Sequence, residues 1–175
     1  MDTQQVYDLL SRIGRPKGAA YYVIPCDELS SISLRKYPVC IIVNSDPSDK
    51  PGQHWLGIFL KSPKSPMEFL DSYALGINTY SHHFVDFARR YGKRIMELKK
   101  RLQGFNATTC GHYCLYYMYM RLNNQQPRCI YKHFNSNYVK NDAKVLNFVR
   151  HNRFLKANQC KFIHKTNQCC TEFLQ

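Results

Sequence analysis

The chain has 175 residues and lacks any run of about 18 apolar residues, so the sequence predicts no membrane-spanning helix. The opening segment MDTQQVYDLL has no basic stretch followed by an apolar run, and this argues against a secretion signal. Internal repeats and low-complexity linkers are also absent from the sequence. We therefore expect one domain over residues 1–175, ending in a short basic, cysteine-containing tail from about residue 155.

Acidic residues are scarce: 12 Asp and Glu stand against 25 Lys and Arg, for a net charge of +13. This excess favours a polyanionic partner such as DNA. Hydrophobic residues make up 44% of the chain, with 13 tyrosines and 10 phenylalanines, which is enough for a core. We expect a monomer that is not secreted, with its eight cysteines reduced.

Paired C-x2-C motifs, which mark many zinc sites, are missing. The tail carries Cys160, His164, Cys169 and Cys170, but the spacing C-x3-H-x4-C-C fits no familiar zinc site. We expect no metal site.

Apolar spacing predicts an amphipathic helix over residues 2–13 and strands over 21–24 and 39–43. Residues 54–60 and 67–73 predict a hairpin around the loop KSPKSP. Pairing Leu60 with Ser65 brings His54 opposite Asp71, close enough for an imidazole and a carboxylate to share a hydrogen bond. The same register aligns four apolar side chains on that face: Leu56, Ile58, Met67 and Phe69.

Residues 81–101 show helical spacing of apolar residues, with a break near Gly92. The opposite face of this predicted helix is basic. We expect DNA to bind there, the alternative being a merely solvated surface. The residues concerned are Lys93, Arg94, Lys99, Lys100 and Arg101. A further short helix is predicted over 142–149.

The apolar run 110–122 predicts a helix buried nearly all round, capped by Thr108 or Thr109. Cys110 falls in its first turn, where unpaired N–H groups favour a thiolate. Cys114, one turn later, is expected to be a packing residue.

A thiolate nucleophile needs a base, an orienting acid and a donor for the oxyanion. His54 is the candidate base and Asp71 the acid that orients it. Gln103, seven residues before Cys110, is the candidate oxyanion donor, together with the Cys110 backbone N–H.

The order His54-Trp55, Asp71, Gln103 and Cys110-Gly111 resembles the adenovirus-type endopeptidases and the related ubiquitin-like-protein-specific proteases. The resemblance covers about residues 39–122. It implies an α+β fold with a central mixed sheet flanked by helices, and papain-like catalytic groups in circularly permuted chain order. It also implies cleavage after small residues, often at Gly-Gly or Gly-X sites, with Trp55 and Gly111 at the substrate.

Two departures from the adenovirus pattern are visible. Asp71 stands where those enzymes usually have Glu, and Asp is the acid of the cellular branch. The adenovirus enzyme bonds a peptide activator through a cysteine about a dozen residues before the oxyanion Gln. Here that region reads Tyr91-Gly92-Lys93, so no disulfide-linked activator is expected. No cofactor is expected to be required, and DNA is left open as an activator.

Three functions are compatible with these features. The first is maturation of capsid or core precursors of a DNA virus or virus-like element, in the virion and host nucleus. The second is removal of ubiquitin-like modifiers in the nucleus or cytoplasm. The third is a basic nucleic-acid-binding protein whose Cys and His residues are structural.

Overall fold

The computed structural model describes residues 1–92 and 94–154, so Lys93 and the tail with its Cys160–Cys170 cluster lie outside the described residues. The longer elements, in chain order, are α1 (Thr3–Gly14), β1 (Ala20–Pro25), β2 (Val39–Asn44), β3 (Trp55–Leu60), β4 (Met67–Leu70), α2 (His82–Tyr91), β5 (Ile95–Glu97), α3 (Cys110–Leu122), α4 (Pro127–Lys132) and α5 (Tyr138–Phe154). Short 3-10 helices are η1 (Arg15–Lys17), η2 (Cys26–Ser31) and η3 (Ile77–Thr79).

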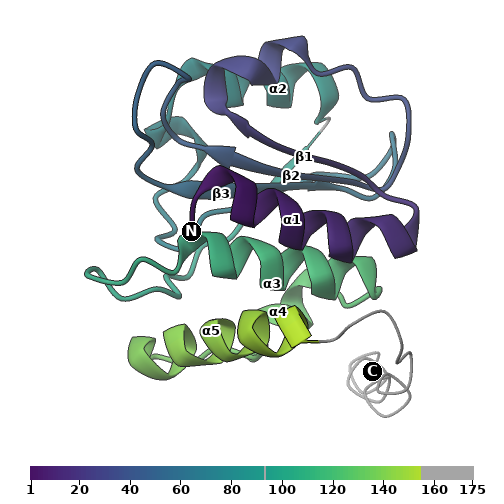
Figure 1. Cartoon of the computed structure of the whole chain (residues 1–175). Helices are drawn as coiled ribbons and strands as arrows, with labels where there is room; N and C mark the ends of the chain where they lie inside the picture. The colour runs from purple at the N-terminus through teal and green to yellow at the C-terminus, as the bar shows by residue number, and fades with distance from the viewer. Residues whose placement is uncertain (93, 155–175) are drawn as a thin grey trace, which may run out of the picture.

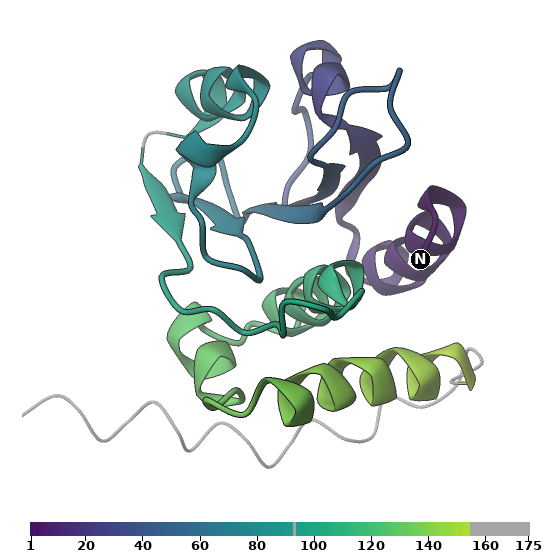
Figure 2. The same ribbon diagram turned by 90° about the vertical axis from the view of Figure 1, so that its left-hand side faces the viewer.

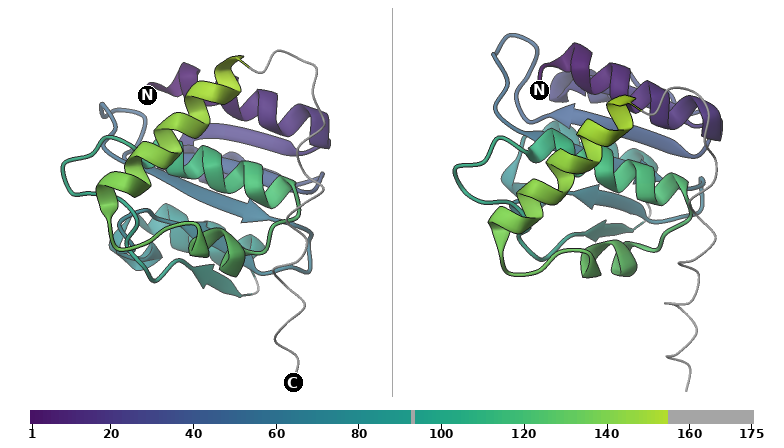
Figure 3. Two further views of the ribbon diagram at one scale, coloured as in Figure 1. Left: turned by 90° about the horizontal axis from the view of Figure 1, so that it is seen from below. Right: turned by 60° about the horizontal axis from the view of Figure 1, so that its bottom comes forward.

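The strands form one mixed sheet in the order β1-β2-β3-β4-β5, with parallel outer pairs and antiparallel inner pairs. Helix α2 and η2 cover one face of the sheet, and α1 and α3 cover the other (Figure 1). Helix α5 lies beyond α3, on the side away from the sheet (Figure 2), and crosses it at an angle (Figure 3). The expected α+β fold, a central mixed sheet flanked by helices, is confirmed.

The buried strands place alternate side chains in two apolar clusters, because successive residues of a strand point to opposite faces. In β2, Cys40 and Ile42 pack with α1 and α3, whereas Ile41 and Val43 pack with α2 and η2. Burial on both faces explains why this strand reads as a continuous apolar run.

The β3–β4 hairpin forms as expected, but the predicted register was wrong by two residues. Leu60 pairs with Met67 and Ile58 with Phe69, so His54 does not stand directly opposite Asp71. A shift of two residues leaves every side chain on its original face, whereas a shift of one would reverse them. His54 and Asp71 therefore still meet, at the open end of the hairpin.

The helix predicted over 81–101 is correct as far as the expected break at Gly92, but wrong beyond it. Helix α2 ends at Tyr91, and residues 95–97 form the edge strand β5, which runs parallel to β4. Gly92 makes this possible because a Cβ there would lie 2.9 Å from Met67 Cβ and 3.0 Å from the Ala88 carbonyl oxygen. Residues 95–97 pair with the free edge of β4. This pairing outweighs the helical spacing of the apolar residues in that segment.

The predicted helix over residues 110–122 is confirmed as α3, and most of its side chains are buried. Its N-cap is Thr109, whose hydroxyl donates to Asp142 of α5 at 2.7 Å and accepts no N–H from the first turn of the helix. The predicted helix over 142–149 lies within α5. In the described part of the chain, no helix is both long and apolar enough to cross a membrane.

Candidate active site

His54 and Asp71 lie at the open end of the β3–β4 hairpin, one just before β3 and the other just after β4. His54 Nε2 and Asp71 Oδ1 are 2.9 Å apart, and the two residues are 9% and 1% exposed. The imidazole also contacts two aromatic rings, with centroids 4.9 Å away for Tyr73 and 6.1 Å for Tyr80. These contacts restrict the ring to one orientation.

Asp71 is a fully bonded carboxylate in a tight turn. Besides His54, its Oδ1 accepts the backbone N–H of Tyr73 at 2.9 Å. Its Oδ2 accepts the Leu75 N–H at 2.8 Å and the Tyr80 hydroxyl at 2.9 Å. Burial would raise the Asp71 pKa, but the bonds from His54 and these donors outweigh it and hold the pKa below its usual range. Asp71 is therefore ionised and fixed.

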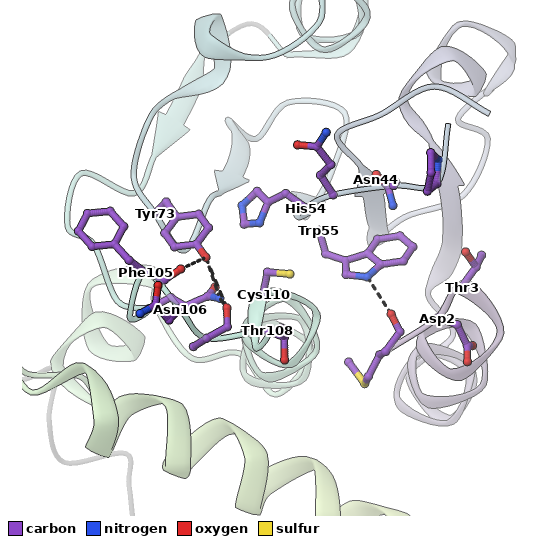
Figure 4. A pocket seen from close by; sticks show the side chains of 16 residues that line it. Asp2, Thr3, Asn44, His54, Trp55, Tyr73, Phe105, Asn106, Thr108 and Cys110 are labelled. Atoms are coloured by element: carbon purple, nitrogen blue, oxygen red, sulfur yellow. Dashed lines mark hydrogen bonds between the residues drawn. The ribbon is translucent and has the colours of Figure 1, made fainter. Parts of the chain in front are cut away.

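Cys110 begins α3 and lines the same cleft as His54 (Figure 4). Burial would raise its pKa, but the interaction with His54 and with the backbone of Trp55 and Gly111 lowers that pKa below its ordinary value. Burial acts to lower the pKa of His54, yet the hydrogen bonds with Asp71 and Cys110 raise it to about 9. These opposite shifts favour a thiolate–imidazolium pair near neutral pH.

Cys114 provides an internal contrast. It lies one turn further along α3, where burial raises the pKa of its thiol well above the usual value. Its Sγ donates to the Trp55 carbonyl oxygen at 3.5 Å. The expectation that Cys114 is a packing residue is supported, and among the described cysteines Cys110 is the one that lines the cleft.

Gln103 lies beside the cleft and is fully buried, at 0% exposure. Its Oε1 accepts the Ser72 hydroxyl at 2.6 Å. Its Nε2 donates to the Tyr73 hydroxyl at 3.2 Å and to the Ala107 carbonyl oxygen. Both amide hydrogens thus have protein acceptors, so binding an oxyanion would require that the oxyanion take the place of one of them.

The cleft has a volume of about 470 Å³. Its walls come from the N-terminal residues, the 51–55 segment that leads into β3, Tyr73 and the 103–108 loop before α3. A second hollow of about 450 Å³ continues past His54 and is lined by residues including Asp46, Leu75 and Tyr80. His54 and Tyr73 line both hollows, so a polypeptide passing through both would pass the candidate base His54.

Trp55 and Gly111, the two residues predicted to contact substrate, lie against each other. Trp55 lines the cleft, and its Nε1 donates to the Met1 carbonyl oxygen at 3.2 Å. Gly111 is buried beneath Trp55 and Met1, where a Cβ would come within 2.9 Å of the Met1 methyl carbon and 3.1 Å of the indole. Its small size therefore positions Trp55, and it is not among the residues that line the cleft.

The predicted DNA-binding residues do not share one helix. Arg94, Lys99 and Lys100 are exposed and flank β5, and Lys93 lies outside the described residues. Arg101 is half-buried, with its guanidinium carbon 3.8 Å from the centre of the Phe105 ring and 4.1 Å from that of Tyr138. Within the described ranges, no group of three or more His, Cys, Asp or Glu side chains is placed to hold a metal ion.

Four contributors to the site were not identified from the sequence: Met1, Ser72, Tyr73 and Tyr80. Ser72 and Tyr73 follow directly after the predicted acid, and that position is the one signal that could have pointed to them. The fold of the chain brings Tyr80 to Asp71 and Met1 to Trp55. Sequence spacing does not reveal these contacts.

No protein-family profile matches this sequence, and no curated protein matches it significantly. The fold is similar to that of the ASFV pS273R protease, solved in its selenomethionine form, with a TM-score of 0.57. The two chains are 16% identical, and the match covers 86% of this chain and 66% of that protease. This chain therefore spans about two thirds of the length of the solved protein. The likeness shows that the two chains share a fold, and it does not single out the adenovirus branch.

Proposed function

We propose that this protein is a cysteine endopeptidase with Cys110 as nucleophile, His54 as acid and base, and Asp71 as the group that orients His54. The observation that carries the proposal is that Cys110, in the first turn of α3, lines one cleft with His54, whose Nε2 lies 2.9 Å from Asp71 Oδ1. The lowered pKa of the Cys110 thiol and the raised pKa of His54 agree with this arrangement. The fold shared with a known cysteine protease supports it.

The proposed reaction has two stages. The Cys110 thiolate attacks the peptide carbonyl carbon, a C–S bond forms, and the carbonyl oxygen takes the displaced electron pair. The C–N bond then breaks, and His54 gives its proton to the leaving amine. Next, His54 takes a proton from water, and the resulting hydroxide cleaves the thioester and releases Cys110. Gln103 and the Cys110 backbone N–H serve as the proposed oxyanion donors.

The proposed substrates are capsid or core precursors of a DNA virus or virus-like element, cut after small residues at Gly-Gly or Gly-X sites in the virion or host nucleus. Two features support this finer assignment: the fold shared with a viral protease and the position of Trp55 in the cleft wall. The residues that bound the cleft come from both sides of Cys110, which suits an extended polypeptide.

The test compares Cys110→Ala with Cys114→Ala on a peptide library. Cys110→Ala should lose all cleavage, whereas Cys114→Ala, which removes an equal thiol one turn away, should keep most of it. Alkylation at pH 6 should modify Cys110 in the wild type, because a thiol of lowered pKa is partly ionised where an ordinary one is not. Cleavage by Cys110→Ala would refute the proposal.

The same library separates the alternatives. Preferential cleavage of ubiquitin-like fusion proteins over Gly-X peptides would favour the modifier-removing enzyme. An unreactive Cys110 with no cleaved peptide would favour a nucleic-acid-binding protein whose thiols are structural.

A further inference from the structure

Ser72 lies between the two halves of the site. It directly follows Asp71, it is 2% exposed, and its hydroxyl donates to Gln103 Oε1 at 2.6 Å. A second connection runs through the backbone: the Ser72 carbonyl oxygen accepts the N–H groups of Leu102 at 2.9 Å and Gln103 at 3.2 Å. The backbone connection holds the chain position of Gln103, so the hydroxyl is left to act on its side chain.

The hydroxyl bond matters because the two ends of an amide are chemically opposite. The oxygen of Gln103 can only accept and its nitrogen can only donate. A donor on Oε1 directs Nε2 toward Tyr73 and Ala107, both of which line the cleft. A reversed amide would set its oxygen against the Ala107 carbonyl oxygen and leave the Ser72 hydroxyl without its acceptor.

We propose that Ser72 is a positioning residue that acts through Gln103, holding the donor end of its amide on the cleft side for the oxyanion. The inference rests on the proposed function. It gives the turn after β4 two tasks: Asp71 orients the base, and its neighbour Ser72 orients the oxyanion donor. The two side chains reach different partners, since Asp71 binds His54 and Ser72 binds Gln103.

The test is a double-mutant cycle measured by steady-state kinetics and by the affinity of a peptide aldehyde, whose adduct with Cys110 carries the oxyanion. Ser72→Ala should lower kcat about 10-fold with KM within about twofold, since the lost interaction belongs to the transition state. Aldehyde affinity should fall by a similar factor. Gln103→Ala alone should cost on the order of 100-fold or more in kcat. Adding Ser72→Ala to Gln103→Ala should cost nothing further.

Two controls separate positioning from general damage. Ser72→Thr keeps a hydroxyl and should retain most activity. Ser65→Ala removes a hydroxyl whose bonds to Ser62 stay within the β3–β4 loop and should leave kcat unchanged. Alkylation of Cys110 should proceed at the wild-type rate in Ser72→Ala, because no oxyanion forms in that reaction.

The outcomes distinguish two failures. If the wild type cleaves peptides and Ser72→Ala behaves like Ser65→Ala, this inference alone is wrong. It is also wrong if Ser72→Ala costs as much in the Gln103→Ala background as in the wild type, because Ser72 would then not act through Gln103. If the wild type neither cleaves peptides nor is alkylated at Cys110, the proposed function is wrong and this inference is wrong with it.

Discussion

At the scale of single residues, the proposed chemistry depends on the pKa of His54, which the hydrogen bond with Asp71 raises. Asp71 is anchored by two backbone N–H groups and the Tyr80 hydroxyl, so it cannot turn away from the imidazole. A fixed carboxylate stabilises the imidazolium more than a mobile one because no reorganisation is needed as charge develops. The proposed chemistry therefore predicts a pH dependence that is set by these contacts.

We expect kcat/KM to follow a bell-shaped pH profile. The acid limb should fall below the ordinary pKa of a thiol, because the pKa of Cys110 is lowered, and the alkaline limb should lie near pH 9, the raised pKa of His54. The Cys110 thiolate and the His54 imidazolium coexist between the two limbs, and the imidazolium is lost above pH 9 as it deprotonates. In Asp71→Asn, which removes the charge that raises the His54 pKa, the alkaline limb should move to lower pH.

Asp86→Asn is the matched control for that measurement, because it makes the same substitution at an exposed carboxylate paired with Arg89. Its alkaline limb should stay near pH 9. An Asp71→Asn limb that also stays there would show that Asp71 does not set the His54 pKa.

At the scale of elements, the position of α3 decides where Cys110 lies. Glu68 of β4 is 4% exposed and binds Arg121 of α3 through two bonds of 2.7 Å, one to Nε and one to Nη2. The Tyr117 hydroxyl donates to the same carboxylate at 2.7 Å. This buried cluster connects the far end of α3 to the strand that carries Asp71 at its end, so it fixes the helix against the hairpin.

Glu68→Ala should lower the free energy of unfolding by about 3–5 kcal/mol, because it leaves the Arg121 charge buried without a partner. Urea-induced unfolding measures the change. Asp86→Ala breaks an ion pair whose side chains are 56% and 77% exposed and should cost less than about 1 kcal/mol. Equal losses in the two variants would contradict a special role for the buried pair.

At the scale of the whole molecule, the chain carries a net charge of +13. Several of these charges lie on the exposed stretch that contains β5 and leads toward the 103–108 loop of the cleft. We keep DNA as a proposed partner for this surface, now based on an edge strand and its flanks instead of a helix face.

Replacing Lys99 and Lys100 by Glu should weaken DNA binding and flatten its salt dependence, because fewer counterions are released from the phosphates. The control replaces Lys61 and Lys64, two exposed residues of the β3–β4 loop, by Glu. It lowers the net charge by the same amount at a different place on the surface. Fluorescence anisotropy over a salt series compares the two variants. Equal losses would assign binding to overall charge, and no wild-type binding at low salt would remove DNA as a partner.

The sequence by itself determined the residue types of the site, their order and most of the elements that carry them. Helix α3 was predictable because its apolar residues leave no polar face, and Cys110 falls at its start. The meeting of His54 and Asp71 was predictable even in a wrong register, because strand side chains alternate with a period of two and the error was two residues.

Only the tertiary structure decided what depends on contacts between distant segments. Residues 95–97 became a strand because the free edge of β4 offered hydrogen bonds, which local spacing cannot reveal. Gln103 became buried because the turn after β4 and the 103–108 loop enclose it, with Ser72 bonded to one end of its amide and Ala107 to the other. Sequence spacing records neither which segments meet nor which polar groups they bury together. It therefore predicts the candidate residues of the site but not the contacts that orient them.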